Sequence, residues 1–293
     1  MKQDQLIGAG ELARLLETPA RIVLLDVRWA LGDPNGFEHY VAGHLPGAVF
    51  VDLDTELAGC ASAAAGRHPL PDPGDFGRAV ARWGIGCGDV VVAYDDWGSM
   101  AAARAWWLLR HAGIIGIRVL DGGLGAWKRA GLPLEAGKPG PVSPPADPVD
   151  VGWGQLPVLD IEAAAAFPGQ GVLLDARPAE RFRGEAEVLD PRPGHIPGAR
   201  NAPALANLDA EGRFLPAAVL RDRYAGLGIT PETGPVGSYC GSGITASHQL
   251  LALGIAGIQG VLYPGSWSQY AADPGRPAEL GDPGGLASTG TKA

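Results

Sequence analysis

The sequence predicts an α/β protein built from two tandem copies of one domain, each a mainly parallel sheet flanked by helices. The first observation behind this prediction is an internal repeat of three motifs in the same order. The paired segments are IVLLDVR (22–28) with GVLLDAR (171–177), GHLPGAVF (43–50) with GHIPGARN (194–201), and DVVVAYDD (89–96) with GPVGSYCG (234–241). Their offsets of 149, 151 and 145 residues are nearly constant, which indicates a tandem duplication.

The second observation is the alternation of short and long apolar segments within each copy. Short runs rich in β-branched residues are typical of buried strands, and apolar residues at helical spacing are typical of helices. In the first copy these are the predicted strands 22–27, 48–53 and 90–95 and the predicted helices 11–17, 76–84 and 101–113. The second copy has predicted strands at 172–176 and 235–240 and a helix at 245–254. In such sheets, ligands bind at the carboxyl ends of strands, so we expect the chemistry at a strand-to-helix turn.

Composition limits the classes of function. The 293 residues are 46% apolar, enough for a core, although 45 Gly and 26 Pro indicate many loops. The formal charge of −9 and the lack of a basic run exclude a nucleic-acid or anionic-membrane partner, and no apolar run approaches the length of a membrane span. Three cysteines form no disulfide framework, and the first 30 residues do not read as a signal peptide, so we expect a cytoplasmic location.

The repeat and the proline content predict the domain boundaries. The segment GKPGPVSPPADPVDVG (137–152) contains five prolines and is the predicted linker, because proline-rich sequence favours extended chain. The first domain is then residues 1–136 and the second 153–280. Residues 281–293 are predicted to be a flexible tail, since they contain few large apolar residues.

Cys240 is the candidate nucleophile. It follows the predicted strand 235–240 directly, and Gly241, Ser242 and Gly243 form a short loop before the next helix. Such a loop can point several backbone N–H groups at one anion, and the helix N-terminus adds positive potential there. Both effects favour a reactive thiolate. The alternative is a small buried hydrophobe, the commonest role of a free cysteine.

Other chemistry of this turn lacks a necessary residue. A Cys-dependent phosphatase needs an arginine six residues after the cysteine, where this chain has Ala246. Cys60 and Cys87 lie in small-residue segments and form no Cys/His cluster, so zinc is not expected. The repeat places Asp95 of the first copy opposite Cys240, and a carboxylate cannot replace the thiol. We therefore predict one active copy and one catalytically silent copy.

At these residues the sequence resembles the tandem rhodanese-domain sulfurtransferases, in which the second domain carries the active cysteine. The resemblance extends to about residue 280 and includes DGGLGAW (121–127) and YPGSW (263–267). Within this family, the uncharged loop Cys-Gly-Ser-Gly-Ile-Thr (240–245) is similar to that of the 3-mercaptopyruvate sulfurtransferases, whereas thiosulfate-using members have two basic residues after the cysteine. The fold that it implies is two rhodanese-like domains.

The resemblance also implies roles for individual residues. Cys240 would carry the sulfur, and Gly241, Gly243, Ile244 and Thr245 would bind the persulfide. Substrate carboxylate binding is implied for Arg181 and Arg192, with Arg183 as the alternative to Arg192. Ser242 would orient substrate or relay a proton, in a possible relay with His44 and Asp33 from the first domain. Because the GH(L/I)PGA motif occurs in both copies, His44 has an alternative role in holding a turn.

The function that the resemblance implies is a two-step sulfur transfer. Cys240 would take sulfur from 3-mercaptopyruvate, release pyruvate, and pass the sulfur to cyanide, a small thiol or a thioredoxin-like protein. No metal or organic cofactor is expected. Two alternatives remain open from the sequence: a thiosulfate sulfurtransferase, and a sulfur carrier that receives its sulfur from another protein without turning over a small donor.

Overall fold

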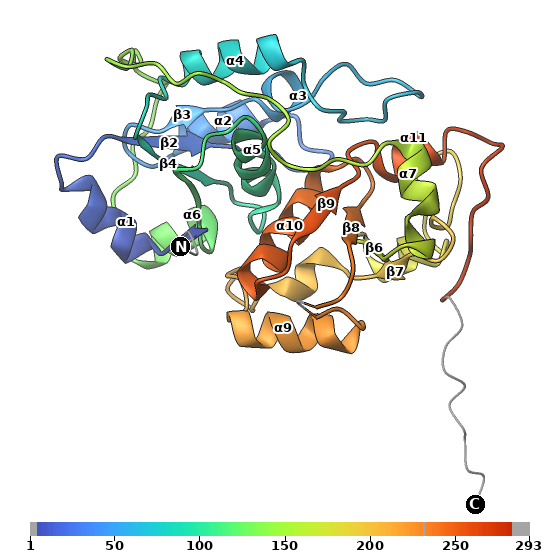
Figure 1. Ribbon diagram of the computed structural model, residues 1–293. Helices are drawn as coiled ribbons and strands as arrows, with labels where there is room; N and C mark the ends of the chain where they lie inside the picture. Colours follow the sequence, from blue (N-terminus) through green and yellow to red (C-terminus); the bar gives the residue numbers. More distant parts are fainter. Residues whose placement is uncertain (1–4, 231, 283–293) are drawn as a thin grey trace, which may run out of the picture.

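Each half of the chain folds around one parallel sheet (Figure 1). The computed structural model describes residues 5–230 and 232–282. The strands of the first sheet lie in the order β1-β5-β4-β2-β3, and those of the second in the order β7-β6-β8-β9. The strands are β1 (Leu6–Ile7), β2 (Ile22–Asp26), β3 (Val49–Phe50), β4 (Val90–Tyr94), β5 (Ile117–Leu120), β6 (Val172–Asp175), β7 (Arg200–Asn201), β8 (Val236–Tyr239) and β9 (Gly260–Leu262). Two tandem parallel-sheet domains confirm the predicted fold class.

Helices flank both sheets. They are α1 (Ala9–Leu16), α2 (Gly36–Ala42), α3 (Leu53–Glu56), α4 (Pro73–Arg82), α5 (Met100–His111), α6 (Gly123–Arg129), α7 (Ile161–Ala166), α8 (Ala179–Phe182), α9 (Ala217–Gly226), α10 (Ile244–Ala256) and α11 (Ser266–Tyr270), with short 3₁₀ turns at Phe167–Gly169 and Ala204–Asn207. One sequence prediction was wrong in part: the expected strand 48–53 pairs only at β3. Its end turns into α3, because the Asp52 carboxylate accepts hydrogen bonds from the N–H groups of Asp54 and Thr55 and so caps a helix there.

The duplication is visible in the register of the central strands. Asp26 of β2 lies beside Tyr94 of β4, and Asp175 of β6 lies beside Tyr239 of β8. Each aspartate is buried and pairs with the arginine two residues later, at 2.8 Å in the first domain and 2.6 Å in the second. Each tyrosine hydroxyl accepts a hydrogen bond from the residue after the motif histidine, Leu45 or Ile196. These contacts fix the backbone at the strand ends of both copies.

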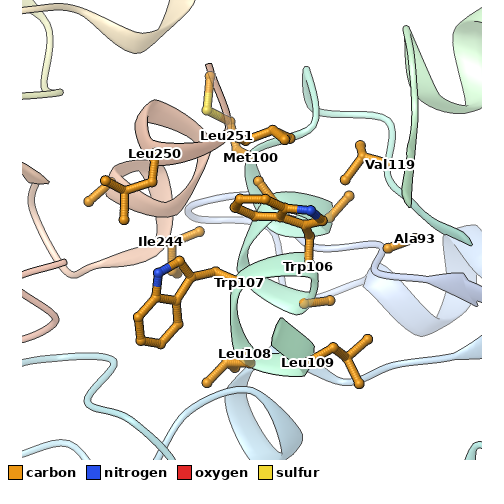
Figure 2. Close-up of a cluster of buried hydrophobic side chains, with 14 of the residues drawn as sticks. Ala93, Met100, Trp106, Trp107, Leu108, Leu109, Val119, Ile244, Leu250 and Leu251 are labelled. Carbon is orange, nitrogen blue, oxygen red and sulfur yellow. The ribbon is translucent and has the colours of Figure 1, made fainter. Parts of the chain in front are cut away.

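The two domains share an apolar core. Helices α5 and α10, which follow the equivalent strands β4 and β8, pack against each other (Figure 1). Figure 2 shows Trp106 and Trp107 of α5 among leucines of both helices, and the two tryptophans are 5% and 2% exposed. Because removal of a buried tryptophan side chain costs about 3–5 kcal/mol, this packing holds the first domain firmly against the helix that follows the candidate nucleophile.

No helix or strand is assigned between α6 and α7, and the predicted linker 137–152 lies in this stretch. The predicted tail 281–293 falls largely outside the described residues. Within residues 5–230 and 232–282, no helix is long and apolar enough to cross a membrane. The same residues contain no His, Cys, Asp and Glu grouping that could hold a metal ion.

Candidate active site

Cys240 lies at the turn from β8 into α10 and is 2% exposed. The N–H of Gly243, the residue before the helix, points at Cys240 Sγ at 3.1 Å. Gly243 has φ +87°, and a Cβ there would lie 2.5 Å from the carbonyl oxygen of Pro264, so the turn requires glycine. The loop therefore aims a backbone donor and the start of a helix at the sulfur, as an anion at that position needs.

The start of α11 holds this loop from behind. The Cys240 N–H donates to Ser266 Oγ at 3.1 Å, while the N–H groups of Trp267 and Ser268 donate to the carbonyl oxygens of Cys240 and Gly241, both at 2.9 Å. Ser266 adopts a left-handed conformation, φ +53°, which is costly for a residue with a side chain. These hydrogen bonds hold the backbone around the candidate nucleophile in place.

Two guanidinium groups flank the loop at Gly241. A Cβ at Gly241 would lie 3.0 Å from Arg67 Nη2 and 3.4 Å from Arg181 Nη1. Among the described residues neither of these two nitrogens has a hydrogen-bond partner, so both are available to a substrate anion. Arg67 and Arg181 both pair with Asp190, and Arg181 also pairs with Glu187 at 2.9 Å. Burial raises the pKa of Asp190, and the charge of Arg67 opposes that shift.

Arg67 was missed by the sequence analysis. It lies in a first-domain loop that reaches the second domain: its N–H donates to Ser268 Oγ at 3.1 Å, and Gln269 Nε2 donates to the carbonyl oxygen of Ala64 at 2.6 Å. This loop has no periodic pattern, so nothing in the sequence indicated that it crosses to α11. The first domain thus places an arginine beside Gly241 of the candidate site.

The structure does not bring Arg192 to the loop. Its Nε, Nη1 and Nη2 donate to the carbonyl oxygens of Tyr270, Ala271, Asp273 and Arg276, and these bonds hold the end of α11. Arg183, the alternative, pairs with Glu185 at 2.7 Å on the surface. Of the three arginines expected from the resemblance, the structure places Arg181 at the loop.

The expected relay residues are not assembled either. His44 Nδ1 contacts the carbonyl oxygen of Tyr40 at 2.8 Å, and its ring stacks on Tyr40 at 3.8 Å. His195 in the other copy contacts the carbonyl oxygen of Phe182 at 2.8 Å and stacks on Phe182 at 3.7 Å. Asp33 is on the surface and pairs with His39, not with His44. Because both copies use the motif histidine in the same way, the geometry favours the turn-holding alternative. Ser242 is in the loop beside Cys240 and is 8% exposed.

In the first domain, the equivalent turn is filled by its own carboxylate. Asp95 follows β4 directly and is fully buried. Its Oδ1 accepts hydrogen bonds from the N–H groups of Trp97 and Ser99, at 3.0 and 2.8 Å. Its Oδ2 accepts from Ala101 and Ala102, at 2.8 and 2.9 Å. Burial raises the pKa of Asp95, and the hydrogen bonds from the N–H groups of Ala102, Trp97 and Ser99 oppose that shift. The anion site of this copy is occupied by the protein itself.

Comparison with known proteins identifies the family of the chain. Residues 8–130 and 161–273 each match the Rhodanese-like domain. The chain belongs to the rhodanese family. Its relatives in the family include SseB of Mycobacterium tuberculosis, provisionally named a thiosulfate sulfurtransferase, which is 45% identical over 94% of this chain and 97% of its own length. The 3-mercaptopyruvate sulfurtransferase of Escherichia coli is 35% identical over 95% of this chain and 99% of its own.

A solved structure shows the same likeness in three dimensions. The crystal structure of Escherichia coli SseA, described as a 3-mercaptopyruvate sulfotransferase, matches this rhodanese chain with a TM-score of 0.77 and 33% identity. The match covers 91% of this chain and all of that one. The predicted membership of the tandem rhodanese-domain proteins is confirmed.

Proposed function

We propose that this protein is a sulfurtransferase that takes sulfur from 3-mercaptopyruvate as a Cys240 persulfide and passes it to cyanide or a thiol. The observation that carries the proposal is the Gly243 N–H at 3.1 Å from Cys240 Sγ, with Arg67 and Arg181 on the open side of the loop. Relatives with 35% to 45% identity carry names of sulfurtransferases that use 3-mercaptopyruvate or thiosulfate, which supports the reaction class.

The first step forms the persulfide. The Cys240 thiolate attacks the sulfur of 3-mercaptopyruvate, and the bond between that sulfur and its carbon breaks. The electron pair remains on carbon as the enolate of pyruvate, and the proton from the donor thiol ends on that carbon. The products are pyruvate and an anionic Cys240 persulfide. The backbone donors of residues 241–245, of which Gly243 already faces the sulfur, stabilise this anion.

Arg67 and Arg181 supply the recognition of the substrate carboxylate. An arginine binds a carboxylate through parallel N–H bonds, and the free Nη atoms of both residues face Gly241. The two positive charges are offset by Asp190 and Glu187, so the mouth suits a monoanion better than dianionic thiosulfate. Arg67 takes the place in this proposal that the sequence analysis gave to Arg192.

The second step returns the enzyme to its starting state. Cyanide or a thiolate attacks the outer sulfur of the persulfide, the sulfur–sulfur bond breaks, and the Cys240 thiolate leaves with the electron pair. Thiocyanate is the product with cyanide, and ping-pong kinetics follow. We also infer a cytoplasmic location, since Cys60 and Cys87 are exposed free thiols, which a reducing compartment preserves.

The deciding experiment is the ratio of kcat/KM for 3-mercaptopyruvate and for thiosulfate, with cyanide as acceptor. A ratio above about ten, equivalent to about 1.4 kcal/mol in the transition state, supports the mercaptopyruvate site. A ratio at or below one makes the protein a thiosulfate sulfurtransferase. No turnover of either donor, with sulfur accepted from a desulfurase, makes it a carrier.

Cysteine variants test the single nucleophile. Cys240→Ser is expected to abolish turnover and the mass increase of one sulfur atom after incubation with donor. Cys60→Ser and Cys87→Ser are matched controls on the surface and are expected to keep both. Loss of turnover in a folded Cys60→Ser or Cys87→Ser protein would contradict the assignment.

A further inference from the structure

Arg104 is a charged side chain in an unusual place. It is the fifth residue of α5 and is fully buried, and its neighbours along the helix are alanines, tryptophans and leucines. This helix packs against α10 of the second domain (Figure 1). A buried guanidinium is costly unless its charge is compensated. Its compensating partners are therefore informative about its role.

Its hydrogen-bond partners are carbonyl oxygens from three segments. Nε donates to Leu57 at 3.1 Å, Nη2 to His68 and Pro69 at 3.1 Å each, and Nη1 to Gly243 at 3.4 Å. Leu57, His68 and Pro69 belong to the first domain, whereas Gly243 is the loop residue whose N–H faces the Cys240 sulfur. Among the described residues no carboxylate pairs with Arg104. The guanidinium of Arg104 therefore donates its hydrogen bonds to carbonyl oxygens, while its positive charge is not balanced by a neighbouring acid.

The charge that interacts favourably with Arg104 is that of Cys240. Burial lowers the pKa of Arg104 to about 10, and the Cys240 thiolate acts against that shift. The guanidinium therefore keeps its proton at neutral pH. Between two buried groups, the attraction is weakly screened by solvent and salt.

We propose that Arg104 is the counter-charge of the Cys240 anion, a positioning residue through which the first domain stabilises the thiolate and the persulfide of the second. The inference rests on the proposed sulfur transfer, because an anion at Cys240 is its central feature. It also assigns a task to the silent domain. That domain has lost its nucleophile, yet it supplies the buried cation that the active loop lacks.

The corresponding positions in the second domain support this assignment. Counted from the start of the helix, Arg104 of α5 corresponds to His248 of α10. Counted by the offset of 145 residues that pairs Asp95 with Cys240, it corresponds to the uncharged Gln249. Both residues of α10 are fully buried. Burial lowers the pKa of His248 to about 3, so this residue is neutral. Asp95 of the first domain already accepts hydrogen bonds from four N–H groups. At the corresponding positions in α10, the second domain supplies no positive counterpart of Arg104.

Several other titratable groups lie around the loop. The first domain contributes Arg67, His68 and Asp54. The second contributes Arg181, Glu187 and Asp190 after β6, Tyr239 on β8, His248 on α10 and Tyr270 on α11. Arg67 and Arg181 are paired with acids, and His68 lies 3.3 Å from Asp54. Arg104 differs from these cations because no carboxylate within residues 5–230 and 232–282 pairs with it.

The test measures the rate at which iodoacetamide alkylates Cys240 as a function of pH, in full-length protein with Cys60→Ser and Cys87→Ser. In Arg104→Met, the midpoint of the profile is expected to move up by about one pH unit or more, with alkylation at pH 7 about tenfold slower. Arg104→Lys, which keeps the charge, is expected to stay near the parent. Arg110→Met, which removes a guanidinium from the same helix, is the matched control and is expected to leave the profile unchanged. A folded Arg104→Met protein with an unchanged profile would overturn the proposal.

A second measurement leaves Arg104 in place, in case Arg104→Met does not fold. Removal of the anion in Cys240→Ser should leave the guanidinium without its counter-charge. The Tm difference from the parent is then expected to be larger at pH 9 than at pH 5, with Cys60→Ser on the surface as the control. A difference that is the same at every pH contradicts the proposal.

Neither measurement depends on the sulfur donor. An unchanged alkylation profile in a protein that turns over 3-mercaptopyruvate overturns the role of Arg104 alone. A shifted profile in a protein that turns over no donor overturns the proposed function and leaves the role of Arg104 intact.

Discussion

Asp95 and Cys240 occupy equivalent positions in the two domains, each directly after the central strand and before the helix at the domain interface. The Cys240 sulfur faces one N–H group of its loop, from Gly243. The Asp95 carboxylate accepts four N–H groups and fills its own loop. The turn is filled by an internal cap in the first domain, and in the second it is the proposed anion site.

Asp95→Ala tests the internal cap. The substitution leaves four N–H groups without their acceptor, and we expect a loss of about 3 kcal/mol in the free energy of unfolding, or a Tm lower by about 6 °C or more. Persulfide formation at Cys240 should persist at a temperature where the variant is folded. The neighbouring Asp96→Ala, with a half-exposed side chain, is the control and should change Tm little. Equal Tm values for Asp95→Ala and the parent would contradict the cap.

Arg67→Met and Arg181→Met test the carboxylate site. Each removes one charged hydrogen-bond donor to the substrate, so we expect KM for 3-mercaptopyruvate to rise about tenfold to a hundredfold. The rise for thiosulfate should be smaller, since thiosulfate has no carboxylate. Steady-state kinetics with both donors measures this difference.

Arg192→Met is the contrasting variant. Four carbonyl oxygens lose their donor, so we expect a lower Tm and a KM close to that of the parent. A large rise in KM for Arg192→Met with none for Arg67→Met would restore the assignment made from sequence.

His44→Gln and His195→Gln form a matched pair. Both histidines stack on an aromatic ring and bond a carbonyl oxygen, so we expect similar losses of stability in the two variants, about 1–2 kcal/mol each. Neither should alter the pH profile of kcat. A change in that profile confined to His44→Gln would support the proton relay with Asp33.

The parts of the site that lie within one turn of chain could be predicted from the sequence. Cys240 and its glycines follow a strand and open a helix, and local spacing is enough to identify such a turn. Arg181 and Arg192 were both placed by resemblance alone. Arg181 lies on α8 and does reach the loop at Gly241, whereas the place of Arg192, eleven residues further, depends on how the chain returns along α11.

The contributions of the first domain could not be predicted, because they depend on how the two copies dock. Arg67 lies in an aperiodic loop, so its contact with Gly241 exists only in the assembled fold. Arg104 did leave a signal: it is the one charged residue in MAAARAWWLL (100–109). A lone charge on an apolar helix must find compensation when that helix is buried, but the sequence does not say from which partner.

Asp26 gives the last prediction, on the dependence of stability on pH. Burial raises its pKa to about 6, against the attraction of Arg28 and a hydrogen bond from Tyr94. The unfolded chain releases this proton near pH 4, so between about pH 4 and 6 the folded state binds more protons than the unfolded state. Stability should therefore fall as pH rises through this window, by about 3 kcal/mol at most from this group.

Asp26→Asn should remove that decline, since an amide does not titrate. Tm measured at intervals from pH 4 to 7 should fall less steeply in Asp26→Asn than in the parent. Asp222→Asn on α9 is the control, because that carboxylate is exposed. Parallel curves for the parent and Asp26→Asn would mean that Asp26 is ionised throughout, held by Arg28 at 2.8 Å, and that the ion pair outweighs burial.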